Sequence, residues 1–251
     1  MLDLGCRDGS FPVDLYDLRV VRVDLEKPTG PCRAFVQADA ARLPFPSGCF
    51  DAVILNHSIE HFAALKPALQ EIGRVVRNGG ALYAAVPNAR TFSDRLYRKL
   101  FRNAGGHVNL FDSSAALAAM LSWYSHLAPA GVTTLYSGFS FWNRANLRAV
   151  DRTMLRVPAL PGPLLALLAA STRWCDALFG TRASQYGWAL YFGSVPLPVE
   201  SDGLRNVCVR CGAGHEEPLL RARARKLAFL RWYRCPACGA GNILCRDSPA
   251  R

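Results

Sequence analysis

Short apolar runs rich in β-branched residues alternate with amphipathic stretches along the first 141 residues, and this alternation is what most constrains the fold. Such runs, bounded by turn residues, are typical of buried strands, and strands separated by helical patterns favour a parallel sheet covered by helices. The predicted strands are Met1–Leu4, Val20–Val23, Ala34–Gln37, Ala52–Leu55, Gly80–Val86, Val132–Phe141 and Gly187–Val195. The pattern therefore predicts one α/β sheet.

Three amphipathic stretches between these strands are predicted helices. Leu65–Val76 repeats its apolar residues at helical spacing, and Gly79-Gly80 after it is the expected stop signal. Arg90–Asn103 and Ser113–Leu127 have the same periodicity.

Residues 143–186 break the alternation and are expected to form a helical insertion. Their apolar run, residues 164–170, is too short to span a bilayer, which takes about 20 apolar residues. A buried or capping helix is the ordinary interpretation. Because the nearby residues Arg148, Arg152, Arg156 and Arg173 are basic, a helix lying on a membrane surface is the alternative.

Charge is unevenly distributed along the chain. Lys and Arg outnumber Asp and Glu by 30 to 19, a net charge of +11, with a basic excess in residues 201–251. A basic tail indicates an anionic partner such as nucleic acid, phospholipid headgroups or an acidic substrate, and a solubilising surface is the alternative. Met1 leads directly into a strand with no secretory signal, so the reducing cytoplasm is the expected compartment, with membrane association as the alternative.

The first predicted strand runs directly into a glycine-bearing turn, Leu4–Gly9. Glycine is required where the backbone adopts a positive φ or a ligand approaches closely, and ligands of open α/β sheets bind beyond the carboxyl ends of the strands. A short helix is expected from about Phe11. The second strand ends in Asp24, whose carboxylate can accept two hydrogen bonds from a ribose diol.

Further motifs follow in order: QADAARLPFP at residues 37–46, FDAVILNHSIEH at 50–61, EIGRVVRNGG at 71–80 and VPN at 86–88. Together with the glycine turn and Asp24, this series resembles the class I S-adenosylmethionine-dependent methyltransferases, specifically the branch called type 11. The resemblance covers about residues 1–111 and implies a Rossmann-like, seven-stranded methyltransferase sheet. It implies S-adenosyl-L-methionine as the cofactor.

The resemblance also implies roles for individual residues. Asp3, Gly5 and Gly9 would lie at the methionine and ribose side of the cofactor, and Asp24 would bind the ribose hydroxyls. Asp39 would bind the adenine amino group, with a backbone amide from Ala40. Asn56 would flank the amino-acid moiety and the methyl group. For Asp39, a helix cap before Ala40-Ala41 is the alternative.

No catalytic residue is fixed by the sequence, because the sulfonium is already activated and a strong general base is optional. His57 and His61 follow the fourth strand, and His107 lies in a GGHVN segment that resembles a substrate-side loop of the family. These three histidines are the candidates for contact with the acceptor, and satisfied structural groups are the alternative.

Two departures from the family pattern concern the cofactor turn. Arg7 occupies the position of the usual middle glycine, so backbone approach to the cofactor is expected to be tighter or shifted. The chain also begins on the first strand, whereas the family places a helix before it; a start further upstream or a partly uncovered sheet would explain this.

Two C-x-x-C pairs lie in the tail: Cys208 with Cys211, and Cys235 with Cys238. Two such knuckles present four thiolates to one ion, so they predict a structural zinc site in a zinc ribbon, with a redox dithiol as the alternative. The other cysteines are expected to be reduced: Cys6, Cys32, Cys49, Cys175 and Cys245.

These observations predict a methyltransferase domain at 1–195, a linker at 196–203 and a zinc ribbon at 204–245. The expected activity is methyl transfer to a small-molecule or lipid-linked acceptor. Alternatives are a nucleic-acid methyltransferase guided by Arg221, Arg223 and Arg225 of the ribbon, and a non-catalytic scaffold. For the ribbon, docking of another protein or a purely folding role is favoured over nucleic-acid binding. The sequence carries no signal for oligomeric state.

Overall fold

A computed structural model describes residues 1–7, 9–11, 19–100, 107–149, 158–195, 203–227 and 230–245. The chain divides into two compact units. Unit 1 comprises residues 1–88, 105–133 and 188–200, and unit 2 comprises residues 89–104, 134–187 and 201–251. The helix expected beyond Phe11 lies outside the described residues, as does almost all of the linker expected at 196–203.

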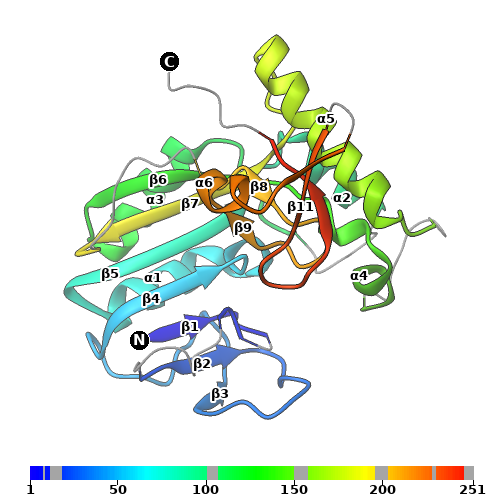
Figure 1. The fold of residues 1–251 in the computed structure, drawn as a ribbon. Coiled ribbons are helices and arrows are strands. Elements are labelled where there is room, and N and C mark those ends of the chain that lie inside the picture. Colours follow the sequence, from blue (N-terminus) through cyan, green and yellow to red (C-terminus); the bar gives the residue numbers. More distant parts are fainter. Residues whose placement is uncertain are drawn as a thin grey trace. The chain divides into compact units, whose positions relative to one another are not determined.

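A seven-stranded sheet has the order β3-β2-β1-β4-β5-β7-β6 (Figure 1). Its strands are β1 (Leu2–Leu4), β2 (Val21–Asp24), β3 (Phe35–Gln37), β4 (Phe50–Asn56), β5 (Val76–Pro87), β6 (Pro129–Tyr136) and β7 (Gln185–Gly193). From β3 to β5 the neighbours are parallel, so the carboxyl ends of these five strands share one edge. The predicted Rossmann-like, seven-stranded methyltransferase sheet is confirmed.

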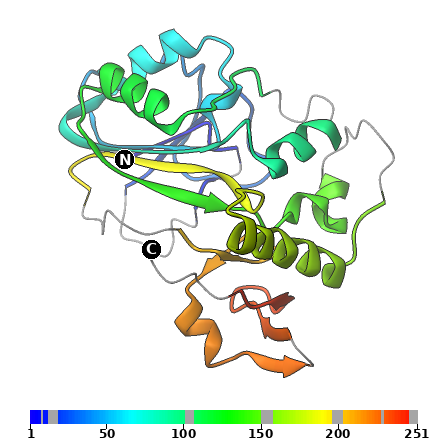
Figure 2. The same ribbon diagram turned by 90° about the horizontal axis from the view of Figure 1, so that it is seen from above.

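Two helices of unit 1 lie side by side on one face of this sheet: α1 (Leu65–Val75) and α3 (Ser114–Ser125) (Figures 1 and 2). Their inner sides are apolar at helical spacing and fully buried, Leu69 and Ile72 on α1 and Leu117 and Leu121 on α3. The helices approach closely at Gly73, where a Cβ would collide with the carbonyl oxygen of Tyr124. A short 3-10 helix, η2 (Ile59–His61), follows β4.

Two predicted boundaries were wrong. The first concerns Gly79-Gly80, which do not stop a helix: α1 ends at Val75, and both glycines lie within β5. Val76 is already extended and pairs with Phe50, and the register then shifts before Ala52. A Cβ at Gly80 would meet the carbonyl oxygens of Asp51 and Arg77, so the irregular pairing requires glycine.

The second concerns the strand predicted at 132–141. It begins earlier, at Pro129, and ends at Tyr136. Phe139 has a left-handed backbone with φ of 52°, which no extended strand accommodates, and a 3-10 turn, η3 (Ser140–Trp142), follows.

Unit 2 contains helices and two small sheets. Its helices are α2 (Phe92–Leu100), α4 (Arg144–Ala149), α5 (Gly162–Phe179) and α6 (Glu217–Arg221). Strands β8 (Asn206–Val207) and β9 (Gly214–His215) form one hairpin, and β10 (Arg225–Leu227), β11 (Leu230–Arg234) and β12 (Gly241–Ile243) form an antiparallel sheet. Among the described residues, no helix has both the length and the apolarity that crossing a membrane requires.

The tail packs within unit 2. The inner side of α5 forms one cluster with Phe139, Val209 and Ile243. Asn143 donates to the carbonyl oxygens of Val209 and Arg210. The first cysteine knuckle is thereby attached to the chain around η3.

Candidate functional site

The glycine turn after β1 is built from left-handed backbone conformations. Gly5, Arg7 and Gly9 have φ of 69°, 49° and 113°. Arg7 thus adopts the conformation that a glycine would adopt at that position, at a steric cost that glycine avoids. A Cβ at Gly5 would collide with the Cβ of Ser58, so this glycine is required for the turn to pass the segment after β4.

Asp3 stabilises this turn from within the first strand. Its side chain is fully buried, and its carboxylate accepts hydrogen bonds from the backbone N–H and the hydroxyl of Ser10. Arg22 lies 3.9 Å away and donates to the carbonyl of Phe11. Burial, followed by the charges of Asp3 and Asp24, raises the pKa of Cys6 to about 12, so this thiol is neutral.

Asp24 ends β2 beside the same turn. Its Oδ2 accepts a hydrogen bond of 2.7 Å from the backbone N–H of Arg7. Its Oδ1 accepts one of 3.0 Å from the backbone N–H of Glu26. These two amides fix the carboxylate at the carboxyl edge of the sheet. Each carboxylate oxygen has two lone pairs, so both retain acceptor capacity for a ligand.

Asp39 follows β3 and is exposed. Its Oδ1 accepts a hydrogen bond from the backbone N–H of Ala41, and its carbonyl accepts one from Arg42. No helix begins there, so the side chain closes a turn and does not cap a helix. Ala40 lies within this turn and is half-buried.

An ion pair on α1, Glu71 with Arg74, holds the loop that carries Asp39 in position, a role that no motif in the sequence indicated. The carboxylate of Glu71 accepts a hydrogen bond of 2.7 Å from the backbone N–H of Leu43. The guanidinium of Arg74 donates hydrogen bonds to the carbonyl oxygens of Leu43 and Phe45. The two side chains also bond each other at 2.7 Å. The hydrogen bond from Arg74 lowers the pKa of Glu71.

Asn56 is the last residue of β4 and is half-buried. Past it the chain turns sharply, because His57 has a φ of 54°. Ser58 and Glu60 are buried immediately beyond. The predicted cofactor residues therefore lie at or just beyond the carboxyl ends of β1 to β4, all within unit 1: Gly5, Gly9, Asp24, Asp39, Ala40 and Asn56.

The three candidate histidines converge on one buried carboxylate. Glu60 is 1% exposed, and its Oε1 lies 3.6 Å from Nδ1 of His57 and 4.0 Å from Nε2 of His61. The rings of His61 and His107 meet edge to face at 5.0 Å between centroids. No described residue donates a hydrogen bond to Oε2 of Glu60.

The segment carrying His107 is fastened to η2 by backbone and side-chain hydrogen bonds. The backbone N–H groups of Val108 and Asn109 both donate to the carbonyl of Glu60. The Asn109 amide donates to the carbonyls of Ile59 and Phe62. The ligand atoms of Glu60, His61 and His107 lie within 4.8 Å of one another, an arrangement whose chemistry suits either proton transfer or a divalent cation.

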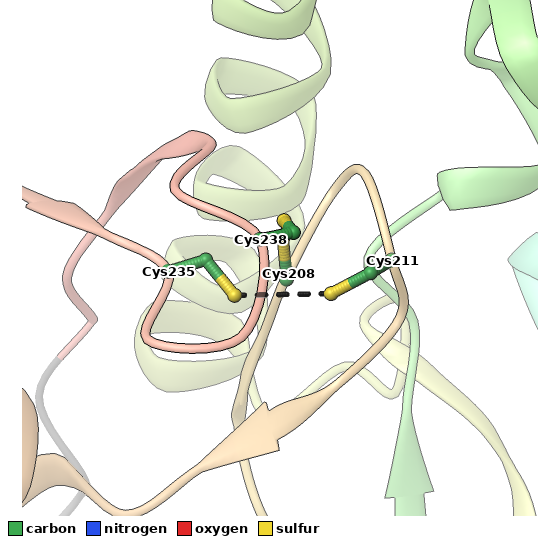
Figure 3. A group of neighbouring side chains, drawn as sticks. All are labelled: Cys208, Cys211, Cys235 and Cys238. Carbon is green, nitrogen blue, oxygen red and sulfur yellow. Dashed lines mark hydrogen bonds between the residues drawn. The ribbon is translucent and has the colours of Figure 1, made fainter.

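The four tail cysteines converge within unit 2 (Figure 3). The sulfur atoms of Cys208 and Cys238 are 3.6 Å apart, and those of Cys211 and Cys235 are 3.7 Å apart. Bonds of about 2.3 Å from a tetrahedral zinc ion place its sulfur ligands about 3.8 Å apart. The four positions therefore fit a zinc ion, and none of the nine cysteines forms a disulfide.

The two knuckles have the same backbone geometry. In each, the first cysteine donates its N–H to a carbonyl five residues on, and the following glycine donates back to that cysteine: Cys208 with Gly212, and Cys235 with Gly239. Both glycines are left-handed, with φ of 74° and 73°. This is the turn that presents two sulfurs on one side.

Polar groups surround these sulfurs. Burial opposes ionisation of Cys208, but hydrogen bonds from the backbone of Cys211 and Arg210 and from the Asn242 amide outweigh it and lower the pKa to about 7. His215, which the sequence analysis did not identify, has its Nε2 3.2 Å from the sulfur of Cys235. Burial lowers the pKa of this imidazole. The C-G-x-G-H spacing that begins at Cys211 is the signal that could have indicated His215.

Residues 2–84 match a family model described as a methyltransferase domain. A demethylmenaquinone methyltransferase of Beutenbergia cavernae is 37% identical over 94 residues, covering 34% of this chain and 39% of the relative. A malonyl-(acyl-carrier protein) O-methyltransferase of Legionella pneumophila is 31% identical over 125 residues, covering 44% of each. The chain spans only about half the length of these curated relatives or less.

Among solved structures, a putative methyltransferase from an antibiotic biosynthesis pathway of Anabaena variabilis is similar in fold. It has a TM-score of 0.50 and 16% identity, covering 77% of this chain and 90% of that one. The chain therefore carries the Rossmann-like methyltransferase fold.

Proposed function

We propose that this chain binds S-adenosyl-L-methionine at the carboxyl edge of β1 to β4 and transfers its methyl group to a small-molecule or lipid-linked acceptor. The single observation that carries the proposal is the position of Asp24. Its carboxylate is held at this edge by the glycine turn itself, through the N–H of Arg7. A carboxylate held there can accept both hydroxyls of a ribose.

Each of the remaining residues of this edge contacts or supports a different part of the cofactor. Gly5 and Gly9 leave the backbone of the turn open to the methionine and ribose side, and Asp3 holds that turn through Ser10. Asp39 and the amide of Ala40 receive the adenine ring, while Glu71 and Arg74 keep their loop in position. Asn56 flanks the amino-acid moiety.

When bound, the cofactor supplies an activated methyl group, so the protein's main contribution is to hold the acceptor nucleophile in line with it. A pair of electrons on an oxygen, nitrogen or carbon of the acceptor would form the new bond to the methyl carbon, while the bond from that carbon to the cofactor sulfur breaks and S-adenosylhomocysteine is the leaving group. A proton leaving the acceptor passes to the imidazole of His107 or His61, and Glu60 stabilises the resulting charge from its buried position. We assign this group to proton transfer and not to a metal.

The class of acceptor is supported by the names of the relatives. They methylate demethylmenaquinone and a malonyl group on an acyl-carrier protein, which are a lipid-like molecule and a carrier-linked metabolite. A tail zinc ion held by four thiolates has no open position, so its role is structural.

An activity screen across metabolite and lipid fractions tests the proposal, with S-adenosylhomocysteine release as the readout. With an active fraction in hand, Glu60→Gln and His107→Asn are each expected to lower kcat at least tenfold with little change in cofactor affinity. Added Mg²⁺ or Mn²⁺ is expected to give no stimulation. Full activity in Glu60→Gln would remove the acid–base assignment, and metal-dependent activity would replace it with a cation site.

Nucleic acid remains the rival acceptor. It predicts salt-sensitive RNA or DNA binding that is lost when Arg221, Arg223 and Arg225 are neutralised together. Arg221 already forms an ion pair with Glu217 at 2.6 Å, which offsets part of its charge. A scaffold without bound cofactor is the other rival, and calorimetry with S-adenosylmethionine separates it from the enzyme.

A further inference from the structure

The outward side of α5 is apolar. Its exposed large side chains are Leu164, Leu167, Trp174, Leu178 and Phe179. At 3.6 residues per turn, their spacing places them along one side of the helix, together with Ser171 and Cys175. We call these residues the apolar stripe. The structure describes every residue of α5, and no charged side chain of that helix lies within the stripe.

The two charged residues of α5 lie elsewhere on it. Arg173 is buried and donates to the carbonyl of Ser137. Asp176 accepts hydrogen bonds from the backbone of Ala183 and Ser184 and from the hydroxyl of Thr181, which closes the turn after the helix. Neither charge solvates the stripe.

The opposite side of α5 is already packed within unit 2. Leu165, Ala166, Ala169 and Ala170 are buried against Val209, which lies in the first cysteine knuckle, and Ile243 of β12. A helix packed on one side normally places charged residues on the other. A contiguous exposed apolar surface of this kind marks an interaction site.

The charge of the chain is concentrated in the unit that carries the stripe. Unit 2 contains 21 Lys and Arg against 7 Asp and Glu, a net +14, whereas unit 1 contains 9 against 12, a net −3. Arg144 on α4 and Arg182 after α5 are among the exposed cations. An apolar helical side with leucine and aromatic residues, in a strongly basic unit, is what binds an anionic membrane surface.

We propose that the apolar stripe of α5 inserts into the surface of an anionic lipid bilayer while the cations of unit 2 bind its headgroups. This goes beyond methyl transfer, because it assigns a lipid surface to a region outside the cofactor edge. Nucleic acid would satisfy the charge but leaves Leu178 and Phe179 in water. A second copy of the chain would cover the stripe but brings two units of +14 together.

Sedimentation with vesicles tests this on the zinc-loaded 251-residue chain. Vesicles of phosphatidylcholine with 30% phosphatidylglycerol are compared with pure phosphatidylcholine vesicles at low and high salt. The wild type is expected to bind the anionic vesicles at least tenfold more tightly than the neutral ones, and raised salt is expected to weaken that binding.

The decisive variant is Leu178→Asp with Phe179→Asp. Both side chains are exposed, 75% and 76%, so the double change leaves the packing of unit 2 intact. It is expected to lower anionic-vesicle binding at least tenfold. Trp123→Asp is the matched control, since Trp123 is 76% exposed but lies on α3 in unit 1, and it is expected to bind like the wild type.

Three outcomes would overturn the proposal. One is absence of binding to anionic vesicles, and another is equal binding by the double variant and the wild type. The third is a wild-type dimer in light scattering that becomes monomeric in the double variant without any vesicle binding, which assigns the stripe to self-association. Cofactor calorimetry on the same samples keeps this result separate from the methyltransferase proposal.

Discussion

The carboxylate of Asp24 accepts the backbone N–H of Arg7 at 2.7 Å, across 17 residues of sequence. This bond joins the end of β2 to the glycine turn after β1. The acidic residue proposed to bind the ribose and the turn proposed to admit the cofactor are therefore one structural unit. A substitution in either is expected to alter the conformation of the other.

Arg7 tests the cost of the left-handed turn. Its φ of 49° costs a non-glycine residue about 1–2 kcal/mol, whereas glycine avoids that cost but loses more chain entropy on folding. Arg7→Gly is therefore expected to stay within about 1 kcal/mol of the wild type, and Arg7→Val to be less stable than Arg7→Gly by at least about 1 kcal/mol. Thermal unfolding in excess zinc measures both. Equal stability of the two variants would contradict the left-handed assignment.

The contribution of Glu71 to stability is expected to depend on pH. Its pKa is held below the usual 4.5, first by the hydrogen bond from Arg74. A carboxyl with a lowered folded pKa contributes stability above its unfolded pKa and loses it as the pH falls through the folded value. Glu71→Gln is thus expected to melt below the wild type at pH 7, and the gap should narrow below pH 4.5.

Melting curves from pH 7 to pH 3 measure this gap. Asp51→Asn is the control, because Asp51 pairs with Arg77 on the surface, where both side chains are more than half exposed and such pairs contribute little. A gap for Glu71→Gln that does not change with pH would show that the ion pair with Arg74 is not its source.

The knuckle cysteines predict zinc content. The purified chain is expected to contain one zinc ion, and Cys235→Ser is expected to lose it together with the fold of the tail. Cys49→Ser, an exposed cysteine of unit 1, should keep full zinc content. His215→Ala removes a group 3.2 Å from the Cys235 sulfur and is expected to weaken zinc retention roughly 10–100-fold. Mass spectrometry under native conditions measures the zinc content of all three variants. A wild type without zinc would refute the site.

The sequence predicted the sheet and its helices because their signals are local. The alternation of apolar runs identified all seven strands of the large sheet, and Asp24, Asp39 and Asn56 occur where those strands end. The ends of β5 and β6 were missed for tertiary reasons: Gly80 lies in an irregular pairing with β4, and the left-handed Phe139 ends an apolar run.

Contacts between residues far apart in the chain could not be predicted from the sequence, because they depend on how the elements pack. Glu71 and Arg74 lie three residues apart on one helix, yet both hold a loop about 28 residues upstream. The apolar run in α5 was recognised, but its spacing alone does not say which side of the helix other residues cover. The predicted domain boundaries stay predictions.

Isothermal titration of S-adenosylmethionine into the zinc-loaded 251-residue chain measures whether the carboxyl edge of β1 to β4 binds the cofactor. The wild type is expected to bind one equivalent, and Asp24→Ala to bind at least tenfold more weakly because the ribose loses its acceptor. Asp51→Ala, a surface carboxylate at the start of β4, should bind like the wild type. No heat of binding in the folded wild type, or unchanged affinity in Asp24→Ala, would contradict cofactor binding at this edge of the sheet.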